Sequence, residues 1–241
     1  MITQIWNAIL YKPLLNILAF LVSIIPGGDV GVAVIILTLL VKTALFPLSQ
    51  KSIESQAKMN LLNPELTKIK NSGASKEEQA KQTFDLYKKY KTNPFSGCLL
   101  VLIQIPIIFA LYYVFLRGLN FDASSLYSFI QTPANISMKF LGIFDIGKNH
   151  IMFLAILAGV SQFFQAYYMP KPAPTSGGGT SFQDSFAKSM NTQMKYVFPF
   201  IVAFIAYSLS GAVALYWVTS NIFAVGQQVY IRRKKDLLVI K

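Results

Sequence analysis

Lys42 is the residue with the clearest chemical consequence, because it lies inside a long apolar run, residues 30–49. An ammonium group exposed to hydrocarbon costs on the order of 2.5–3.5 kcal/mol. On one helix Lys42 shares a face with Thr38, Leu45 and Ser49. We therefore expect Lys42 to face a water-filled concavity. The alternative is snorkelling, in which its flexible stem carries the charge toward the inner headgroups.

Polar side chains also interrupt the other apolar runs. They are Gln104, Gln165 on a face with Ser161 and Tyr168, and Trp217 on a face with Asn221 and Gln228. Taken singly, each is more often an interhelical hydrogen bond than a substrate contact. The apolar runs hold no acidic residue, so none of them offers Lys42 an ion-pair partner. Together with Lys42 these residues can wall one polar groove.

Membrane spans are the elements that must position these residues. The chain is 54% hydrophobic and 13% charged, with mean hydropathy +0.47, whereas soluble domains are about 25% charged. The long apolar runs are 30–49, 95–116, 151–169 and 196–231. The last run exceeds one span of about 20 residues, so we expect it to fold back at 208–211, where small residues permit a turn. The sequence predicts an all-α polytopic membrane protein with five spans.

The N-terminal segment is interpreted as an interfacial amphipathic helix, because its apolar stretch before Pro26 is too short to cross a bilayer. A signal peptide is the rival interpretation, but the basic start and the cleavage site are missing. The predicted divisions are then an interfacial helix (1–28), span 1 (29–50), a cytosolic helical hairpin (51–92), span 2 (93–116), an extracytoplasmic loop (117–149), span 3 (150–170), a cytosolic loop (171–190), span 4 (191–210), span 5 (211–231) and a basic tail (232–241).

The distribution of basic residues predicts the orientation. Nine lysines lie in 50–92 and five basic residues lie in 232–241, so both segments are expected in the cytosol. Residue 29 is then outside and the C-terminus inside. The net charge of +12 attracts anionic lipids at the inner leaflet and can also contact ribosomal RNA.

The cysteine count and the absence of known motifs argue against several function classes. The single cysteine, Cys98, excludes an internal disulfide, and no Cys/His cluster has the spacing of a metal site. His150 begins a span, where contact with headgroups is more common than proton relay. No motif of an enzyme or of a nucleotide site is present. We expect no enzymatic activity, cofactor or metal.

The charged connection 51–92 has helical character. Ser75 and Glu78 form a capping box, which predicts that a helix starts at Lys76 and runs to about 91. Its few apolar residues can bury little surface, so the hairpin should be mobile. It is either a solvated spacer or an arm that recruits substrates or partners, through residues such as Lys58, Lys68, Ser75, Glu78 and Lys88.

Three segments together resemble one known family. Asn93–Leu99 with Leu102–Ile107 is similar to the second core span of the YidC/Oxa1/Alb3 membrane protein insertases. Ser210–Trp217 with Ser220 and Asn221 resembles the last span, and Thr38–Leu48 resembles the first. The resemblance covers essentially residues 1–235 and implies a bacterial short form without a large extracytoplasmic domain. Such members usually carry a lipoprotein cysteine near the N-terminus, and this chain has none there.

The resemblance implies a five-span core around a groove that opens to cytosol and lipid and is closed on the outer face. In most bacterial members an arginine projects into this groove, and the matching residue here is Lys42. Gln104, Gln165 and Trp217 match other groove positions. The implied function is insertion of nascent membrane proteins without nucleotide. The implied partners are anionic lipids, the ribosome through the basic tail and the Sec translocon, with a monomer as the active form.

Two alternatives stay open. A small-solute transporter or channel would also use a charged groove, but transporters tend to show repeated halves and acidic residues within spans. A membrane assembly chaperone that inserts nothing is harder to exclude from the residues alone.

Overall fold

The computed structural model describes residues 4, 6–92, 96–116, 121, 125–169 and 192–239, and for residues 60, 96–103, 116 and 234–239 it describes the backbone alone. The predicted cytosolic loop 171–190 lies outside these residues, as do Asn93, Pro94 and Phe95 of the second-span motif.

The chain begins with a continuous helix made of a π-helical turn, η1 (Asn7–Tyr11), and α2 (Lys12–Ile24). Leu14, Leu18 and Val22 of α2 are buried in the core, while Phe20 and Ile24 are exposed. A short 3-10 turn, η2 (Pro26–Gly28), then reverses the chain with Gly27 and Gly28 at positive φ. A Cβ on Gly28 would lie 2.1 Å from the Asn135 carbonyl oxygen, so this turn requires glycine.

The first predicted span is bent. Helices α3 (Val30–Ala44) and α4 (Phe46–Leu61) meet at Leu45 with an angle of 60°. Pro47 lacks the N–H that would bond to the Thr43 carbonyl, and its ring crowds that carbonyl. The predicted straight helical face from Thr38 to Ser49 is therefore wrong, because Ser49 lies beyond the bend.

Helix α4 leads directly into a helical hairpin of α5 (Asn63–Lys70) and α6 (Lys76–Lys89). The Ser75 hydroxyl accepts a hydrogen bond from the Glu78 amide (3.3 Å), as the capping box predicts, and the Glu78 carboxylate accepts one from Gln82 (3.2 Å). The hairpin has a small core of its own, formed by Met59, Leu62, Leu66, Leu86 and Tyr87.

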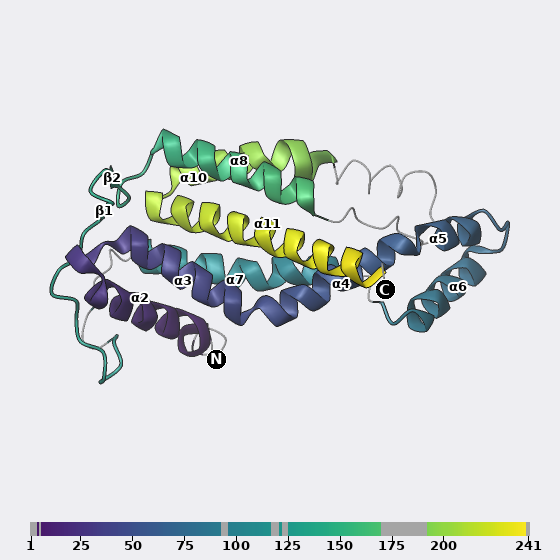
Figure 1. The fold of residues 1–241 in the computed structure, drawn as a ribbon, viewed down its shortest axis with the longest axis horizontal. Helices are drawn as coiled ribbons and strands as arrows, with labels where there is room; N and C mark the ends of the chain where they lie inside the picture. The colour runs from purple at the N-terminus through teal and green to yellow at the C-terminus, as the bar shows by residue number, and fades with distance from the viewer. Residues whose placement is uncertain are drawn as a thin grey trace.

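The other helices are α7 (Ser96–Leu116), α8 (Met152–Tyr168), a π-helical turn η3 (Gln193–Val197) that leads into α10 (Phe198–Ser208), and α11 (Gly211–Val239). The chain turns between α10 and α11, where the sequence predicts a break. Helix α11 lies between α8 and α10 on one side and α3 and α7 on the other (Figure 1). The helix extends to Val239, so the predicted basic tail begins as a continuation of α11 and is not a separate segment.

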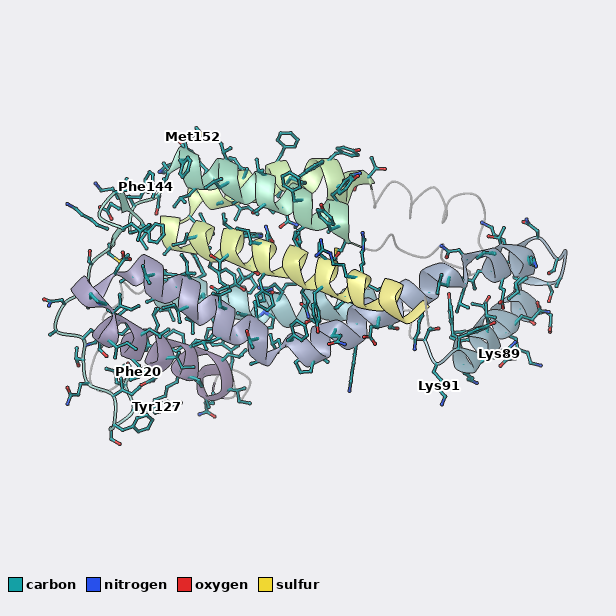
Figure 2. All side chains as sticks on the ribbon, viewed as in Figure 1. Phe20, Lys89, Lys91, Tyr127, Phe144 and Met152 are labelled. Atoms are coloured by element: carbon teal, nitrogen blue, oxygen red, sulfur yellow. The ribbon has the colours of Figure 1, made fainter. Side chains whose placement is uncertain are left out.

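The main core runs through α2, α3, α7, α8, α10 and α11, and Leu18, Val34, Leu111, Ala158 and Val202 are among its buried residues. In Figure 1 the α5–α6 hairpin extends beyond one end of these helices, and the strands β1 (Lys139–Phe140) and β2 (Phe144–Asp145) lie at the other. Figure 2 shows the same separation, with Lys89 and Lys91 far from Phe144 and Met152.

Residues 125–150, which we name the end cap, are tied by hydrogen bonds to several helix ends. Asp29 accepts from the amides of Val32 (3.1 Å) and Leu141 (2.8 Å), and Val30 donates to the Ser137 carbonyl (3.0 Å). Gly211 and Ala212, at the start of α11, donate to the Lys148 and Ile146 carbonyls (both 3.0 Å). The sequence pattern predicts only a loop here.

The buried Asn16 holds the end cap to α2. Its oxygen accepts from the Tyr127 amide (2.6 Å), and its nitrogen donates to the Ser125 (3.3 Å) and Lys12 (2.7 Å) carbonyls. Asn16 is 1% exposed, so these bonds satisfy an amide that would be costly to bury alone.

Length and hydropathy identify candidate spans among the described residues. Helix Asn7–Ile24 alone is long and apolar enough to cross a membrane, and Val30–Ala44 with Phe46–Met59 qualifies as one bent span. Gln104–Phe115 and Met152–Tyr168 are apolar but shorter. The N-terminal helix has 18 residues and is therefore longer than the apolar stretch before Pro26 that the sequence shows. Its length permits either a membrane crossing or an interfacial position.

Candidate functional site

Lys42 lies in the last turn of α3 and reaches across to α7. Its Nζ donates a hydrogen bond to Gln104 Oε1 (2.7 Å), and Gln104 Nε2 donates to the Tyr216 hydroxyl of α11. Three helices distant in sequence thus share one polar chain. Among the described residues Lys42 has only this partner, so two of its three N–H groups are available to other acceptors.

The local backbone favours a positive charge at this point. Lys42 lies near the C-terminal end of α3, where the helix dipole is negative and stabilises a cation by about 0.3–1 kcal/mol. Because Pro47 supplies no N–H, it leaves the Thr43 carbonyl without its helical donor. In α7, Pro106 does the same for Leu102, close to Gln104. The negative end of the α3 dipole is therefore the backbone feature that favours the cation.

A second polar cluster joins α8 to α11. Gln162 Oε1 accepts from Trp217 Nε1 (3.1 Å) and from Asn221 Nδ2 (3.2 Å), while Gln162 Nε2 donates to Gln165 Oε1 (2.7 Å). Asn221 also donates to the Ser161 hydroxyl (3.1 Å). The structure thus brings together Gln165, Trp217 and Asn221, and Gln162 connects them.

Helix α11 carries both clusters on adjacent residues. Tyr216 is bonded toward α7 and Trp217 toward α8, as expected for successive positions about 100° apart on a helix. Thr38, the remaining groove candidate, is 1% exposed, and its hydroxyl donates to the Val34 carbonyl (2.6 Å). Thr38 therefore lies in the core with its donor already used.

A concavity of about 370 Å³ lies between the start of α4 and α11, next to the bend that follows Lys42. Its lining residues are Phe46, Phe223, Gly226, Gln227 and Tyr230. The Phe46 ring contacts those of Phe223 (centroids 6.5 Å apart) and Tyr230 (6.2 Å). Gln227 Nε2 donates to the Phe46 carbonyl (3.2 Å) and to the Ser49 hydroxyl (2.6 Å), so its amide joins α11 to the bend.

The candidate recruitment residues are all exposed: Lys58 lies near the end of α4, Lys68 on α5, Ser75 at the N-cap of α6, and Glu78 and Lys88 on α6. In the same hairpin the Tyr90 hydroxyl donates to Glu65 Oε1 (2.9 Å), and this bond to a carboxylate raises the pKa of Tyr90. The exposed surface of this region carries many lysines, together with the exposed apolar side chains of Leu61 and Phe84.

Comparison with known proteins bears on the whole arrangement. The family model described as the 60Kd inner membrane protein matches residues 20–237, which include both polar clusters, the bend and the hairpin. The chain belongs to this family.

Relatives in the family carry the name membrane protein insertase YidC. The chain is 34% identical to the one from Fusobacterium nucleatum, over 93% of this chain and 98% of that protein. It is 35% identical to the one from Clostridium tetani, over 89% and 87%. The YidC of Pelobacter propionicus is 30% identical over 95% of this chain, which spans only 39% of that longer protein. Membership in the YidC family identifies the chain as a bacterial inner membrane protein.

Three polar residues that are central in the structure of this YidC-family chain were not predicted from the sequence: Gln162, Tyr216 and Gln227. Gln162 and Gln165 are three residues apart on one helix, a spacing at which side chains meet, so their pairing had a readable signal. Tyr216 and Gln227 form contacts with residues distant in sequence, which periodicity does not reveal.

Proposed function

We propose that this chain inserts newly made membrane proteins and helps them fold, through a polar groove centred on Lys42 and without nucleotide hydrolysis. The observation that carries the proposal is the Lys42–Gln104–Tyr216 chain, which holds a cation between three apolar helices. Lys42 is half-buried among apolar helices, where a partner of opposite charge stabilises a cation, and the apolar runs of the sequence contain no acid. A passing substrate with an acidic group is a partner of matching chemistry.

The proposed membrane arrangement has five spans, formed by α3 with the start of α4, α7, α8, η3 with α10, and α11 up to about residue 231. Residue 29 and the end cap are then outside, and the α5–α6 hairpin and the C-terminus inside. The lysine content of 50–92 supports this orientation, since basic loops remain in the cytosol. Residues 1–28 form an interfacial helix on the outer side.

The groove acts by attraction and hydration. A single-span substrate begins with a short, often acidic tail that must cross hydrocarbon. Lys42 attracts a carboxylate with an energy on the order of 4 kcal/mol at ~4 Å and an effective dielectric constant of ~20. Gln104 holds the ammonium in place and leaves two N–H groups for the tail. The apolar part of the substrate then partitions into lipid, which drives its release.

The second cluster and the concavity extend the proposed groove on either side of α11. Gln165, Trp217 and Asn221 supply polar contacts toward α8. The aromatic concavity near Phe46 suits an apolar segment of substrate, because its lining is mainly Phe and Tyr rings. Thr38 supports the groove by packing, since its hydroxyl is satisfied within α3.

The hairpin and the tail are the proposed contacts with the cytosol. Exposed lysines such as Lys58, Lys68 and Lys88 recruit substrate or anionic lipid, and the basic end of α11 approaches the ribosome. The Sec translocon is a further proposed partner, and one copy of the chain suffices for activity.

Replacement of Lys42 tests the proposal. In proteoliposomes we expect Lys42→Ala and Lys42→Glu to lower insertion of a single-span substrate with an acidic tail by more than about tenfold, since 1.4 kcal/mol corresponds to a factor of ten. Lys42→Arg should retain insertion, because the guanidinium keeps the charge. The measurement is protease protection of the translocated tail.

A substrate with a neutral tail is the matched control and should depend much less on residue 42. Equal insertion of the acidic substrate by the unsubstituted protein and the three Lys42 variants would refute the groove mechanism. Solute flux across the same vesicles in the absence of insertion would indicate a transporter or channel.

A further inference from the structure

The turn between β1 and β2 exposes apolar side chains in a strained backbone. Leu141 and Ile143 are 63% and 73% exposed. Leu141 has φ 51° and Gly142 φ 72°. Glycine adopts this region without cost, but leucine does not. The Leu141 amide is fixed by its hydrogen bond to Asp29 Oδ2 (2.8 Å), so its position is set by the start of α3.

Exposure of these apolar side chains to water does not stabilise the turn. An asparagine or glycine would fit the backbone of residue 141 better, and a polar residue would interact better with solvent. A leucine held in the left-handed region and presented outward indicates an apolar contact surface.

An apolar stripe on α8 leads to this turn. Phe153, Ile156, Val160, Phe164 and Tyr167 are exposed at a spacing of three or four residues, so they form one outward face. The Phe144 ring of β2 stacks on Phe153 with centroids 5.3 Å apart and planes 8° from parallel. Figure 2 shows Phe144 beside Met152 at the end of α8. The β-hairpin therefore continues the stripe beyond the end of the helix.

The length of α8 explains why an extension is needed. Its 17 residues rise about 25 Å at ~1.5 Å per residue, whereas the hydrocarbon core is ~30 Å thick. Lipid next to α8 would have to thin, or another apolar element must cover the difference. Ile143 directly precedes Phe144 in the chain and Leu141 lies two residues earlier, so the exposed turn adjoins the end of the stripe, where that element is required.

Charges near the turn match the chemistry of headgroups. Lys139, on β1, is exposed, and Lys148 is exposed beyond β2, where it pairs with Asp145 (3.5 Å). Lysines beside an apolar tip are positioned as at the ends of spans, with ammonium groups among phosphates and apolar side chains below them.

We propose that the β1–β2 turn is a lipid anchor, which inserts Leu141 and Ile143 into the outer leaflet and completes the short span α8. The occupant of this surface is the acyl-chain boundary of the outer leaflet, with Lys139 on the phosphates. The inference rests on the membrane placement given under the proposed function.

Spin labels in proteoliposomes test the anchor. In a Cys98→Ser background, cysteines are placed at Ile143, at Val160 on the α8 stripe and at Lys148. The readout is collision with oxygen, which dissolves in lipid, against collision with a water-soluble nickel chelate. We expect labels at 143 and 160 to favour oxygen and the label at 148 to favour nickel.

Two results would overturn the lipid-anchor proposal, and they distinguish its failure from failure of the proposed membrane placement. A label at 143 that favours nickel, with 160 still favouring oxygen, refutes the anchor and keeps α8 in lipid. A label at 160 that favours nickel contradicts the membrane placement and the anchor with it. As a second variant, Leu141→Asn preserves the left-handed backbone and removes apolar surface. It should shift the label at 143 toward nickel, and an unchanged label would count against the role of Leu141.

Discussion

The ammonium of Lys42 is held by one strong hydrogen bond and by the end of a helix, and no acidic residue in the apolar runs of the sequence neutralises it. This combination fixes the position of the ammonium and leaves two of its N–H groups without an acceptor among the described residues. A carboxylate partner would make a tighter pair and would compete with substrate, whereas the neutral Gln104 orients the cation and leaves its field available.

Tyr216→Phe tests the role of Gln104 as an orienting group. The change removes the acceptor of Gln104 Nε2, so we expect a loss of about 1 kcal/mol in stability and a smaller reduction in insertion than that of Lys42→Ala. The measurements are thermal unfolding in detergent and protease protection.

Tyr207→Phe is the matched control, since the Tyr207 hydroxyl makes no hydrogen bond among the described residues. If both variants behave as the unsubstituted protein does, the Gln104–Tyr216 contact does not orient Lys42.

Residue types and periodicity identified several residues of the candidate site. A lysine in an apolar run stands out because an ammonium group in hydrocarbon is energetically costly. Helical spacing indicated the face that carries Gln165 and the face that carries Trp217 and Asn221. The structure connects Lys42 to Tyr216 through Gln104, and it connects Gln165, Trp217 and Asn221 through Gln162. These contacts depend on how α3, α7, α8 and α11 pack. Such pairings are long-range, so no local pattern encodes them. For the same reason, helical spacing did not reveal that Thr38 is buried in the core.

At the scale of elements, the bend between α3 and α4 determines the direction of the hairpin arm. Pro47 creates the bend, and the Gln227 amide bonds to the Phe46 carbonyl and the Ser49 hydroxyl on its far side. These two hydrogen bonds tie α11 to the first turn of α4 and so help to fix the geometry of the break.

Gln227→Leu should loosen α4. Loss of two hydrogen bonds at a buried site is expected to speed amide exchange in 48–61 by about tenfold or more. Hydrogen–deuterium exchange with mass spectrometry measures it.

Gln228→Leu is the control, since Gln228 is equally buried and its Oε1 has no hydrogen-bond partner in the described part of the chain. Similar exchange in both variants would contradict the role of Gln227.

Helix positions were readable from the sequence, while the connections were less so. The apolar runs, the turn near residue 209 and the capping box at Ser75 correspond to helix boundaries in the structure. The bend at Leu45 was missed although Pro47 signalled it. The end cap has no periodic pattern, and its order depends on Asp29 and Asn16, which lie more than one hundred residues earlier.

At the scale of the whole molecule, the two ends differ in kind. The hairpin end is basic and has a small separate core, while the end cap is bonded to α2, α3 and α11. Figure 1 shows the long helices between them. Substrate contact is therefore proposed at the hairpin end and closure at the other.

Asn16→Leu should weaken the closed end. It leaves the Tyr127 amide and the Ser125 carbonyl without their partner, with a loss of about 1–3 kcal/mol. Thermal unfolding measures this loss. Ser23→Ala, also on α2 but exposed, is the control. Equal melting temperatures for the two variants would show that Asn16 does not hold the cap.

The end cap also has an electrical consequence. A wet groove that ran through the bilayer would conduct ions and discharge the gradient on which a bacterial cell depends. In the proposed membrane arrangement, residues 125–150 cover the outer ends of the helices through backbone hydrogen bonds, so water that reached Lys42 from the cytosol would stop there. The transmembrane voltage would then fall across a layer thinner than the bilayer, and its inside-negative polarity would pull an acidic tail at Lys42 outward with a stronger force than in plain lipid.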